Sequence, residues 1–501
     1  MRGARLSPIA ISLAVAGLVS LGVAPSAQTP GASTLTADAL FQTSKVWTIH
    51  LTLPNDSFSA LMPMAPATPP PSAVQVAAPP REIPTVLPLD LLKMVAAGGF
   101  LGPEGGRNGI SGSKGIDFAY VHASLDFAGI KFADVAVRPK GNGTYNPVLT
   151  GKVQKPSLKI DLNKFVKGQK LAGVTTINLH NSLFDPTWMN EALAFRLYRD
   201  AGVPAPRTAF ARVYLTAKGG EADRYLGLYT LVENVDESFT QSRFKVDGGA
   251  LFKPVTILPF KFLSKDWKDY NQMYDPKTDL TDADKQRVID FCDMLTHASD
   301  DVFTAQIGSF LDVDAFAKYM AVVVWMANPD SLLEQGQNYY VHFNPTTKKY
   351  VFLPWDQDHS FGQFIPWRSI ESQQKLDIMH PWVNRFERAP FASQVDYDLM
   401  TRTFKLEAFK RSYLAALAAL TRTLTQPERI AKQVDDLIPV LAPIVAEEPK
   451  DGRVISFNEA THEGTFRRPF NQSSPEINPI KVFVPIRQGS VLAQLRALGV
   501  Q

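Results

Sequence analysis

Short stretches in which apolar and polar residues alternate follow one another through the first half of the chain. A period of two predicts β-strands with one buried face. Between two of these stretches, an apolar stripe at helical spacing predicts a helix at 187–201, which Asp185 would cap. The predicted strands are residues 46–53, 117–127, 132–138, 155–162, 174–179, 208–215, 225–232 and 250–254.

From residue 281 onward the spacing of apolar residues becomes that of helices. An abrupt change from an apolar strand to an acidic loop at Glu233–Phe239 marks where a hinge between two parts would fall. The predicted fold class is therefore α+β, with a sheet-rich part at 116–254 and a helix-rich part at 255–501. Helices are predicted at 281–297, 312–325, 400–424 and 426–445, and residues 480–498 predict a strand followed by a final helix.

The stretch Lys349–Gly362 joins a buried strand to a pair of carboxylates. Its apolar run Tyr350–Leu353 predicts a short strand, and Asp356 and Asp358 follow it closely. An ionised carboxylate without a partner at the end of a buried strand is costly. These two carboxylates are therefore expected to be hydrogen-bonded or to hold a cation.

Two further polar residues precede this stretch at the ends of predicted elements. Asp330 follows a buried helix that Pro329 ends, and Asn338 begins the next strand. An Asp, then an Asn, then a strand that ends in Asp and Gly is the order in which protein kinases present their catalytic base and two magnesium ligands. The chain is therefore predicted to carry a phosphoryl-transfer site here.

A glycine turn follows the predicted strand at 132–138. Gly141, Asn142 and Gly143 form this turn, with Arg138 and Lys140 beside it. Backbone amides in such a turn can cradle phosphate, although Gly-Asn-Gly is also an ordinary turn sequence.

Four charged residues of the sheet-rich part are candidates for nucleotide binding. Alternation places Lys155 and Lys159 on one strand face, either as phosphate ligands or as part of a solvated face. Glu191 either pairs with a strand lysine or is a favourable acid in the first helical turn. Glu233 opens the acidic loop where the hinge is expected.

Composition narrows the choice of function. The 501 residues carry a net charge of +3, which gives no global field that would favour nucleic acid or an anionic membrane as a partner. The one cysteine, Cys292, cannot form an intrachain disulfide. The histidine spacing does not match a zinc-protease motif, and no Gly-x-Ser-x-Gly elbow is evident.

The N-terminus predicts export. Residues 1–27 combine two arginines, the apolar run Ile9–Val23 and small residues for cleavage, as in a signal peptide; an uncleaved anchor is the alternative. Residues 28–115 contain one strand and a Pro/Gly-rich insertion, with the proline-dense tract at 54–88. No later run has transmembrane length, so we expect a protein that is secreted, periplasmic or at the cell surface, without a stable membrane span after cleavage.

With these motifs in place, the chain resembles the CotH family, the kinase-like spore-coat protein H group, from about residue 135 to the C-terminus. Each motif is short, and the resemblance depends on their number and order. They are Arg138–Thr144, Lys155–Ile160, Asp185 with the helix that ends in Ala201–Pro206, Gly227–Glu233, Gly249–Lys253, Gln337–Tyr340, Pro354–Asp358 with Phe361–Gly362, and Phe483–Arg487 with Gln494–Leu495.

The resemblance implies an atypical protein-kinase-like two-lobed fold, with an antiparallel N-lobe sheet and one helix, and a helical C-lobe. It also implies an enzyme that uses ATP and Mg²⁺ or Mn²⁺ to phosphorylate Ser or Thr on secreted or surface proteins. Asp330 then looks like the catalytic base. Asn338 and Asp356 look like metal ligands, with Asp358 as the second candidate carboxylate.

The remaining family positions concern the nucleotide. Lys155 or Lys159 would hold the phosphates beneath the turn Gly141–Gly143, and Glu233 would lie at the nucleotide hinge. The turn is shorter than a full kinase glycine loop, which leaves phosphate binding less well defined.

Two other readings remain open. The chain is a non-catalytic surface or coat-interaction protein on the same fold if ATP does not reach it outside the cytoplasm. It is a hydrolase if Asp356 and Asp358 act as an acid/base pair, but two residues apart on a strand they lie too close for most glycosidase geometries.

Overall fold

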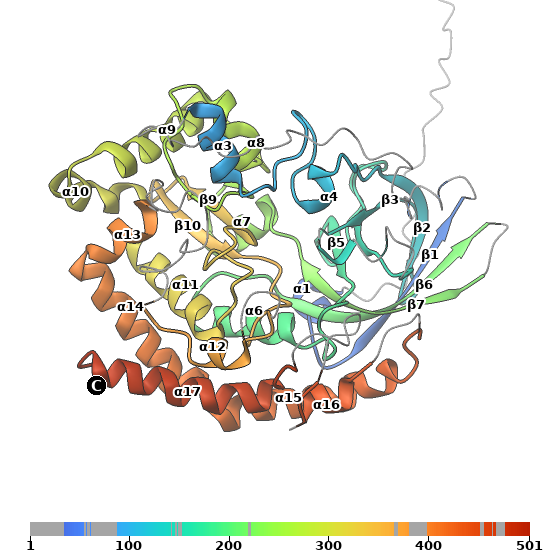
Figure 1. Cartoon of the computed structure of the whole chain (residues 1–501). Helices are drawn as coiled ribbons and strands as arrows, with labels where there is room; N and C mark the ends of the chain where they lie inside the picture. Colours follow the sequence, from blue (N-terminus) through green and yellow to red (C-terminus); the bar gives the residue numbers. More distant parts are fainter. Residues whose placement is uncertain are drawn as a thin grey trace, which may run out of the picture.

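The computed structural model describes most of the chain outside its N-terminus and the proline-dense tract. The predicted signal segment lies outside the described residues, as does nearly all of the tract at 54–88. Figure 1 shows a β-barrel on one side and a mainly helical part on the other. The described residues are 35–54, 57, 61, 88–141, 143–145, 148, 153–218, 222–364, 369–379, 398–450, 455–462, 464–466 and 476–500.

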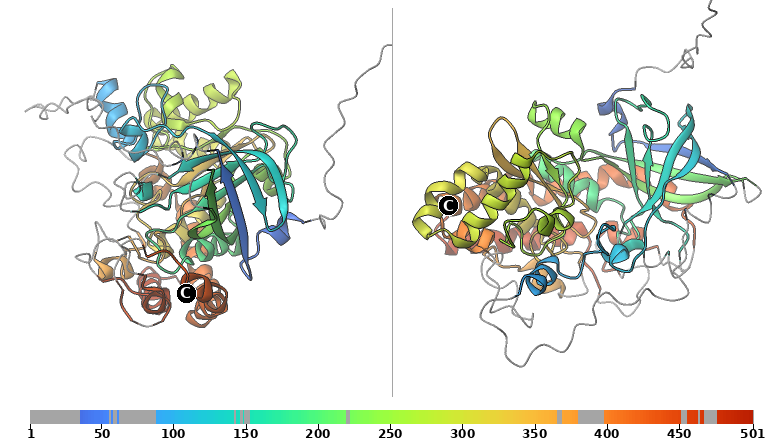
Figure 2. Two further views of the ribbon diagram at one scale, coloured as in Figure 1. Left: turned by 90° about the vertical axis from the view of Figure 1, so that its right-hand side faces the viewer. Right: turned by 90° about the horizontal axis from the view of Figure 1, so that it is seen from above.

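Seven strands form a closed barrel in the order β1-β2-β3-β4-β5-β7-β6. Neighbouring strands are antiparallel except at the closure, where β1 runs parallel to β6. The second view of Figure 2 shows the barrel strands apart from the helices. The strands are β1 (Val46–Leu53), β2 (Val121–Phe127), β3 (Ile130–Lys140), β4 (Ser157–Asp161), β5 (Thr176–His180), β6 (Thr208–Ala217) and β7 (Arg224–Glu233).

The expected antiparallel sheet is closed into a barrel. The predicted strand near residue 46 is β1, and its inward residues Ile49, Leu51 and Leu53 are buried in the barrel core. β1 pairs with β6 along its whole length and with β2 through Ile49–Thr52, which satisfies backbone groups that an open edge would expose. The N-terminal strand is therefore part of the barrel.

The helical part surrounds a three-stranded sheet in the order β10-β9-β8. The predicted strand at 250–254 is β8, which lies in this sheet and not in the barrel. Residues 480–497 form one helix, so the strand predicted there is wrong. The elements are α7 (Glu237–Phe244), β8 (Leu251–Phe252), α8 (Lys268–Tyr274), α9 (Asp282–His297), α10 (Asp300–Phe310), α11 (Val313–Met326), β9 (Tyr339–Asn344), β10 (Lys349–Pro354), α12 (Ile370–Gln374), α13 (Asp398–Lys405), α14 (Glu407–Ala419) with a π-helical turn (Leu420–Leu424), α15 (Pro427–Val445), α16 (Phe457–Thr461) and α17 (Ile480–Ala497).

The helix α6 (Asn190–Asp200) connects the two parts. It begins later than the predicted Thr187, and the Asp185 carboxylate accepts hydrogen bonds from the backbone N–H groups of Thr187 and Asn190, each at 2.9 Å. Its apolar residues share one hydrophobic cluster with the helical part and with residues of β6 and β7, while a second cluster fills the barrel. The division into two lobes is therefore less clear than expected, because α6 and the barrel wall belong to the helical core.

Short helices precede and follow β1. α1 (Ala37–Leu40) comes before it, and α3 (Leu89–Ala97) and α4 (Ile110–Ser113) lie between β1 and β2. Residues Ala96 and Ala97 of α3 are buried in the helical core. Within the described ranges, none of the helices has the length and apolar character that crossing a membrane requires.

A buried ion pair joins the barrel to the end of α15. Lys155 Nζ contacts Glu448 Oε1 and donates to the Leu228 carbonyl oxygen at 2.8 Å, and the Leu228 N–H donates to Glu448 Oε2 at 2.8 Å. Both charged side chains are at most 1% exposed. A Cβ at Gly227 would overlap the Glu448 carboxylate, so this position needs glycine.

We expect Glu448→Gln to destabilise the fold by about 3–5 kcal/mol, because it leaves the Lys155 ammonium buried beside a neutral partner. Urea unfolding followed by circular dichroism measures the change. The matched control is Glu371→Gln, which removes a solvent-exposed partner of Lys375 and should leave the midpoint unchanged. Equal midpoints for Glu448→Gln and the wild type would show that the buried pair does not hold the barrel.

Candidate active site

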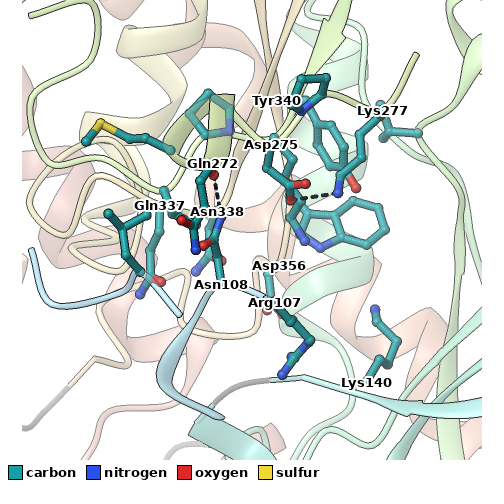
Figure 3. A pocket seen from close by; sticks show the side chains of 18 of the residues that line it. Arg107, Asn108, Lys140, Gln272, Asp275, Lys277, Gln337, Asn338, Tyr340 and Asp356 are labelled. Atoms are coloured by element: carbon teal, nitrogen blue, oxygen red, sulfur yellow. Dashed lines mark hydrogen bonds and ion pairs between the residues drawn. The ribbon is translucent and has the colours of Figure 1, made fainter. Parts of the chain in front are cut away.

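A cleft of about 1890 Å³ opens where the barrel meets the helical part. Side chains of β3, β4 and β5 line it from the barrel, and residues around α8, β8, β9 and β10 line it from the helical part. Figure 3 shows several of these side chains, with Asn338, Asp356 and Lys140 labelled. A drug-sized ligand occupies roughly 300–1,000 Å³, so the cleft has space for a nucleotide and part of a second substrate.

The β9–β10 pair brings Asn338 and Asp356 together. Tyr339 is paired with Pro354, and the N–H of Trp355 donates to the carbonyl oxygen of Asn338 at 3.0 Å. Asn338 and Asp356 both have positive φ, +61° and +52°. A left-handed backbone at two non-glycine residues costs free energy, on the order of 1 kcal/mol each, and such strain often gathers at functional sites.

Asp330 is held by the two amides that follow it. Gln337 Nε2 donates to Asp330 Oδ1 at 2.7 Å, and Asn338 Nδ2 donates to Asp330 Oδ2 at 3.1 Å. Gln337 and Asn338 line the cleft, whereas Asp330 lies behind them with a side chain that is 16% exposed. The predicted catalytic carboxylate is thus fixed next to the cleft and not on its wall.

Asp356 and Asp358 both line the cleft, in different environments. The Asp356 side chain is 41% exposed and that of Asp358 is 14% exposed. Burial, followed by the charges of Asp356, Glu191 and Asp330, raises the pKa of Asp358 well above its usual range. Crowded carboxylates of this kind are stabilised in their charged form by a bound cation.

His359 lies between the two acidic segments. Its Nε2 is 3.9 Å from Asp330 Oδ2 and 3.9 Å from Asp358 Oδ1. The ring stacks on Phe184, with centroids 5.9 Å apart, and meets Phe364 edge-on at 5.0 Å. No sequence pattern identified His359 as a neighbour of these two carboxylates.

A buried chain of contacts joins Lys140 of the barrel to Glu191 of α6 through His180. Lys140 Nζ contacts His180 Nε2, and His180 Nδ1 lies 2.8 Å from Glu191 Oε2. Burial lowers the pKa of Lys140 to about 7, although Asp356 opposes the shift, and burial raises the pKa of Glu191 to about 7. Glu191 therefore reaches its strand lysine through His180, which no sequence pattern identified.

Two more lysines face the same space. Burial lowers the pKa of Lys159 to about 8, with Arg138 adding to the shift, and burial lowers the pKa of Lys253 to about 8, with Lys277 adding to it. The Lys253 ammonium also lies over the Trp355 ring, 5.3 Å from its centroid. These are cations in a low-dielectric cleft, where they favour an anionic ligand.

Some predicted nucleotide-binding residues do not line the cleft. Lys155 is engaged by Glu448, outside the residues that line it, so Lys140 and Lys159 are the better phosphate candidates. Glu233 is also turned away, because Arg207 and Arg243 bind its carboxylate, each at 2.6 Å. The residues after it, Asn234, Val235 and Asp236, line the cleft in the expected hinge position.

The glycine turn lies at the rim. Gly141 lines the cleft with φ +99°, and Gly143 begins a 3₁₀ turn, Gly143–Tyr145. Asn142 lies outside the described residues. The turn is thus near the lysines, as phosphate binding would require.

Two sets of side chains suit a divalent cation, and Asp356 belongs to both. Asn338, Asp356 and Asp358 offer the oxygen ligands that Mg²⁺ and Mn²⁺ prefer. The Nδ2 of Asn338 is used by Asp330, so its Oδ1 is the atom that would face a cation. The alternative set is His180, Glu191 and Asp356, whose ligand atoms lie within 4.8 Å of one another.

The last helix supports both acidic segments from behind. Arg487 of α17 is fully buried, and its guanidinium donates to the carbonyl oxygens of Val324 and Trp325 at the end of α11, at 2.9 and 3.1 Å. Phe483 packs so closely on Gly362 that a Cβ there would overlap its ring. One helix therefore fixes the segment before Asp330 and the segment after Asp358.

Comparisons with known proteins identify the family of this chain. The sequence model of the family described as CotH kinase protein matches residues 137–474. Inner spore coat protein H of Bacillus subtilis (strain 168) is 24% identical over 205 residues, 40% of this chain and 54% of that protein, so the match spans about half of its length. A solved HipA–HipB–operator DNA complex from Shewanella oneidensis MR-1 matches at 12% identity over 68% of this chain and 64% of that chain, with a TM-score of 0.23, too low to support an argument. Because the family match covers more than half of the residues, this chain belongs to the CotH kinase family.

Proposed function

We propose that this protein is an exported atypical kinase that transfers the γ-phosphoryl group of ATP to a Ser or Thr hydroxyl of a secreted or surface protein. The observation that carries the proposal is the meeting of Asn338, Asp356 and Asp358 beside buried lysines in one cleft, with Asp330 hydrogen-bonded to Asn338 directly behind the cleft wall. Phosphoryl transfer needs little covalent chemistry from a protein, so positioning and charge neutralisation by such groups suffice for catalysis.

Each group has a role in this proposal. Asp330, oriented by Gln337 and Asn338, accepts the proton of the acceptor hydroxyl. Lys140 and Lys159 hold the phosphates from the barrel side. A divalent cation held by Asp356 with Asp358 and Asn338 would neutralise charge on the transferred group.

The location of the protein is also proposed. The apolar N-terminal run supports export, and the name of the Bacillus subtilis relative, a spore coat protein, supports action at a coat or cell surface. Acceptor proteins would then be found in the same compartment.

A binding protein on the same fold is the second candidate. One observation favours it: Asp330 lies behind Gln337 and Asn338 and does not line the cleft. In that case the cleft would bind a ligand without transferring phosphate, and replacing Asp330 would leave the biological role intact.

We expect Asp330→Asn to reduce phosphate transfer by about 10²–10⁴-fold while the fold is kept, because the amide cannot accept the proton. The measurement is incorporation of labelled phosphate from ATP into surface proteins or into the protein itself. Asp290→Asn, an exposed position on α9, is the control and should transfer at the wild-type rate. A wild-type protein that incorporates no label and shows no thermal shift with ATP would rule out the kinase proposal.

Asp356→Asn tests the cation. The change should weaken Mn²⁺ binding and abolish transfer, because both candidate ligand sets lose their shared carboxylate. Calorimetric Mn²⁺ titration without nucleotide separates binding from activity. Two further substitutions identify the set that binds the cation. Asp358→Asn lowers Mn²⁺ affinity if Asn338, Asp356 and Asp358 are the ligands. His180→Gln lowers it if His180, Glu191 and Asp356 are the ligands. Unchanged Mn²⁺ affinity in Asp356→Asn would contradict the assignment.

We also expect ATP affinity to fall as pH rises through about 7 to 8. Lys140 has a pKa lowered to about 7, and Lys159 and Lys253 have pKa values lowered to about 8, so these lysines are charged below this range and lose their charge above it. Binding constants for ATP measured from pH 6.5 to 9.5 should decline at the alkaline end, while those for adenosine stay flat. Lys159→Arg keeps its charge and should reduce the decline; an equal pH dependence for ATP and adenosine would show that the lysines do not hold phosphate.

A further inference from the structure

Residues 98–109, called here the strap, form a wall of the cleft that the family match does not include. The strap follows α3 and precedes α4, whereas the match begins at residue 137. Leu101, Glu104, Gly105, Gly106, Arg107 and Asn108 of the strap line the cleft.

The strap is fixed to the helical part at its start. The carbonyl oxygen of Ala96 accepts hydrogen bonds from Ile257 N at 2.8 Å and from Thr256 Oγ1 at 2.9 Å. Lys93 of α3 also pairs with Asp269 of α8, at 3.1 Å. The strap therefore starts from a rigid support on one side of the cleft.

From this support the strap crosses to the barrel. Gln272 of α8 donates from Nε2 to the carbonyl oxygens of Gly102 and Pro103, at 3.0 and 2.9 Å, and accepts from Asn108 Nδ2 at 2.6 Å. Arg107 Nη2 then donates to the carbonyl oxygen of Gly141 at 2.7 Å. The strap thus joins α8 to the glycine turn.

The backbone of Arg107 is held in place by two close approaches. A Cβ at Gly102 or at Gly112 would overlap the Arg107 carbonyl oxygen, so both positions need glycine. The guanidinium lies over the Phe118 ring, 4.1 Å from its centroid. A side chain fixed at its backbone, its ring contact and its tip is prepared for a ligand before the ligand arrives.

Arg107 belongs to a group of cations around the glycine turn. In addition to burial, the charge of Arg138 lowers the pKa of both Arg107 and Lys159. The charges of Lys277 and Arg107 likewise add to burial in lowering the pKa of Lys253. The carboxylates of Asp117 and Asp275 raise the pKa of Arg107 against this effect, and Asp275 is also paired with Lys277 at 2.6 Å. Several cations brought together out of water favour a ligand with several negative charges.

We propose that Arg107 is a phosphate-binding residue for the nucleotide, supplied by the strap from outside the family domain. This inference rests on the proposed kinase function. Its position favours the nucleotide over an acidic acceptor, because the guanidinium donates to the carbonyl oxygen of Gly141, the residue after Lys140, and the proposed function assigns the phosphates to Lys140 and Lys159. The planar fork of arginine suits phosphate oxygens better than the point charge of lysine does.

The test is calorimetric binding of Mg–ATP, Mg–ADP and adenosine to the full chain. We expect Arg107→Gln to weaken ATP and ADP by about 10- to 100-fold, the range for a charge-assisted hydrogen bond, and to leave adenosine unchanged. The dependence of ATP affinity on salt should also become shallower, which a merely structural role would not cause. Lys114→Gln removes a charge from an exposed residue just beyond the strap and should bind all three like the wild type.

Arg107→Lys guards against misfolding, since it keeps the charge without the fork, and its ATP affinity should lie between those of the wild type and Arg107→Gln. Equal loss of adenosine and ATP binding would overturn the inference, because Arg107 would then only shape the cleft. Unchanged ATP binding with a raised KM for an acceptor protein would overturn it too, in favour of acceptor binding. If the wild type binds ATP but Arg107→Gln binds it equally well, only the inference fails; if the wild type binds no nucleotide, the kinase proposal fails with it.

Discussion

Lys140 contacts His180, and His180 contacts Glu191. These contacts allow a lysine and a glutamate to be buried at the cleft. An ammonium and a carboxylate buried this close to Asp356 cannot both be left unpaired, because each loses its hydration. The His180 imidazole gives each of them a partner, because Nε2 contacts Lys140 and Nδ1 contacts Glu191. Burial keeps the pKa of His180 low, so the ring adds no charge. Protein kinases join a strand lysine to a helix glutamate directly, whereas here His180 lies between Lys140 and Glu191.

The positions of the charged side chains at the cleft are fixed by packing contacts that lie outside the cleft. Arg487 and Phe483 of α17 fix the segments that carry Asp330 and Asp358, and Lys155 with Glu448 fixes the barrel against the end of α15. In each of these contacts, the two partners are far apart in the sequence. The acidic site is therefore a product of the whole helical core, because α11, β10 and α17 belong to one hydrophobic cluster.

Much of this could be predicted where chemistry is local. The order Asp330, Asn338, Asp356 can be predicted because each residue lies close to the end or the start of an element with a clear pattern, and β9 and β10 do bring the last two together. Barrel closure was not readable, because alternation identifies β1 without naming its partners. His180 ends a strand that is buried throughout, where no period separates a core residue from a functional one.

Lys155 shows why alternation alone misleads. The pattern put it on the same face as Lys159, but β4 begins at Ser157, so the strand's alternation does not reach Lys155. Its side chain turns to Leu228 and Glu448, and the resulting buried pair resists separation of the barrel from α15.

Contacts of the strap are hydrogen bonds of part-buried groups, which exchange with water at lower cost. Separating the strap from its partners therefore costs less free energy than separating the Lys155–Glu448 pair.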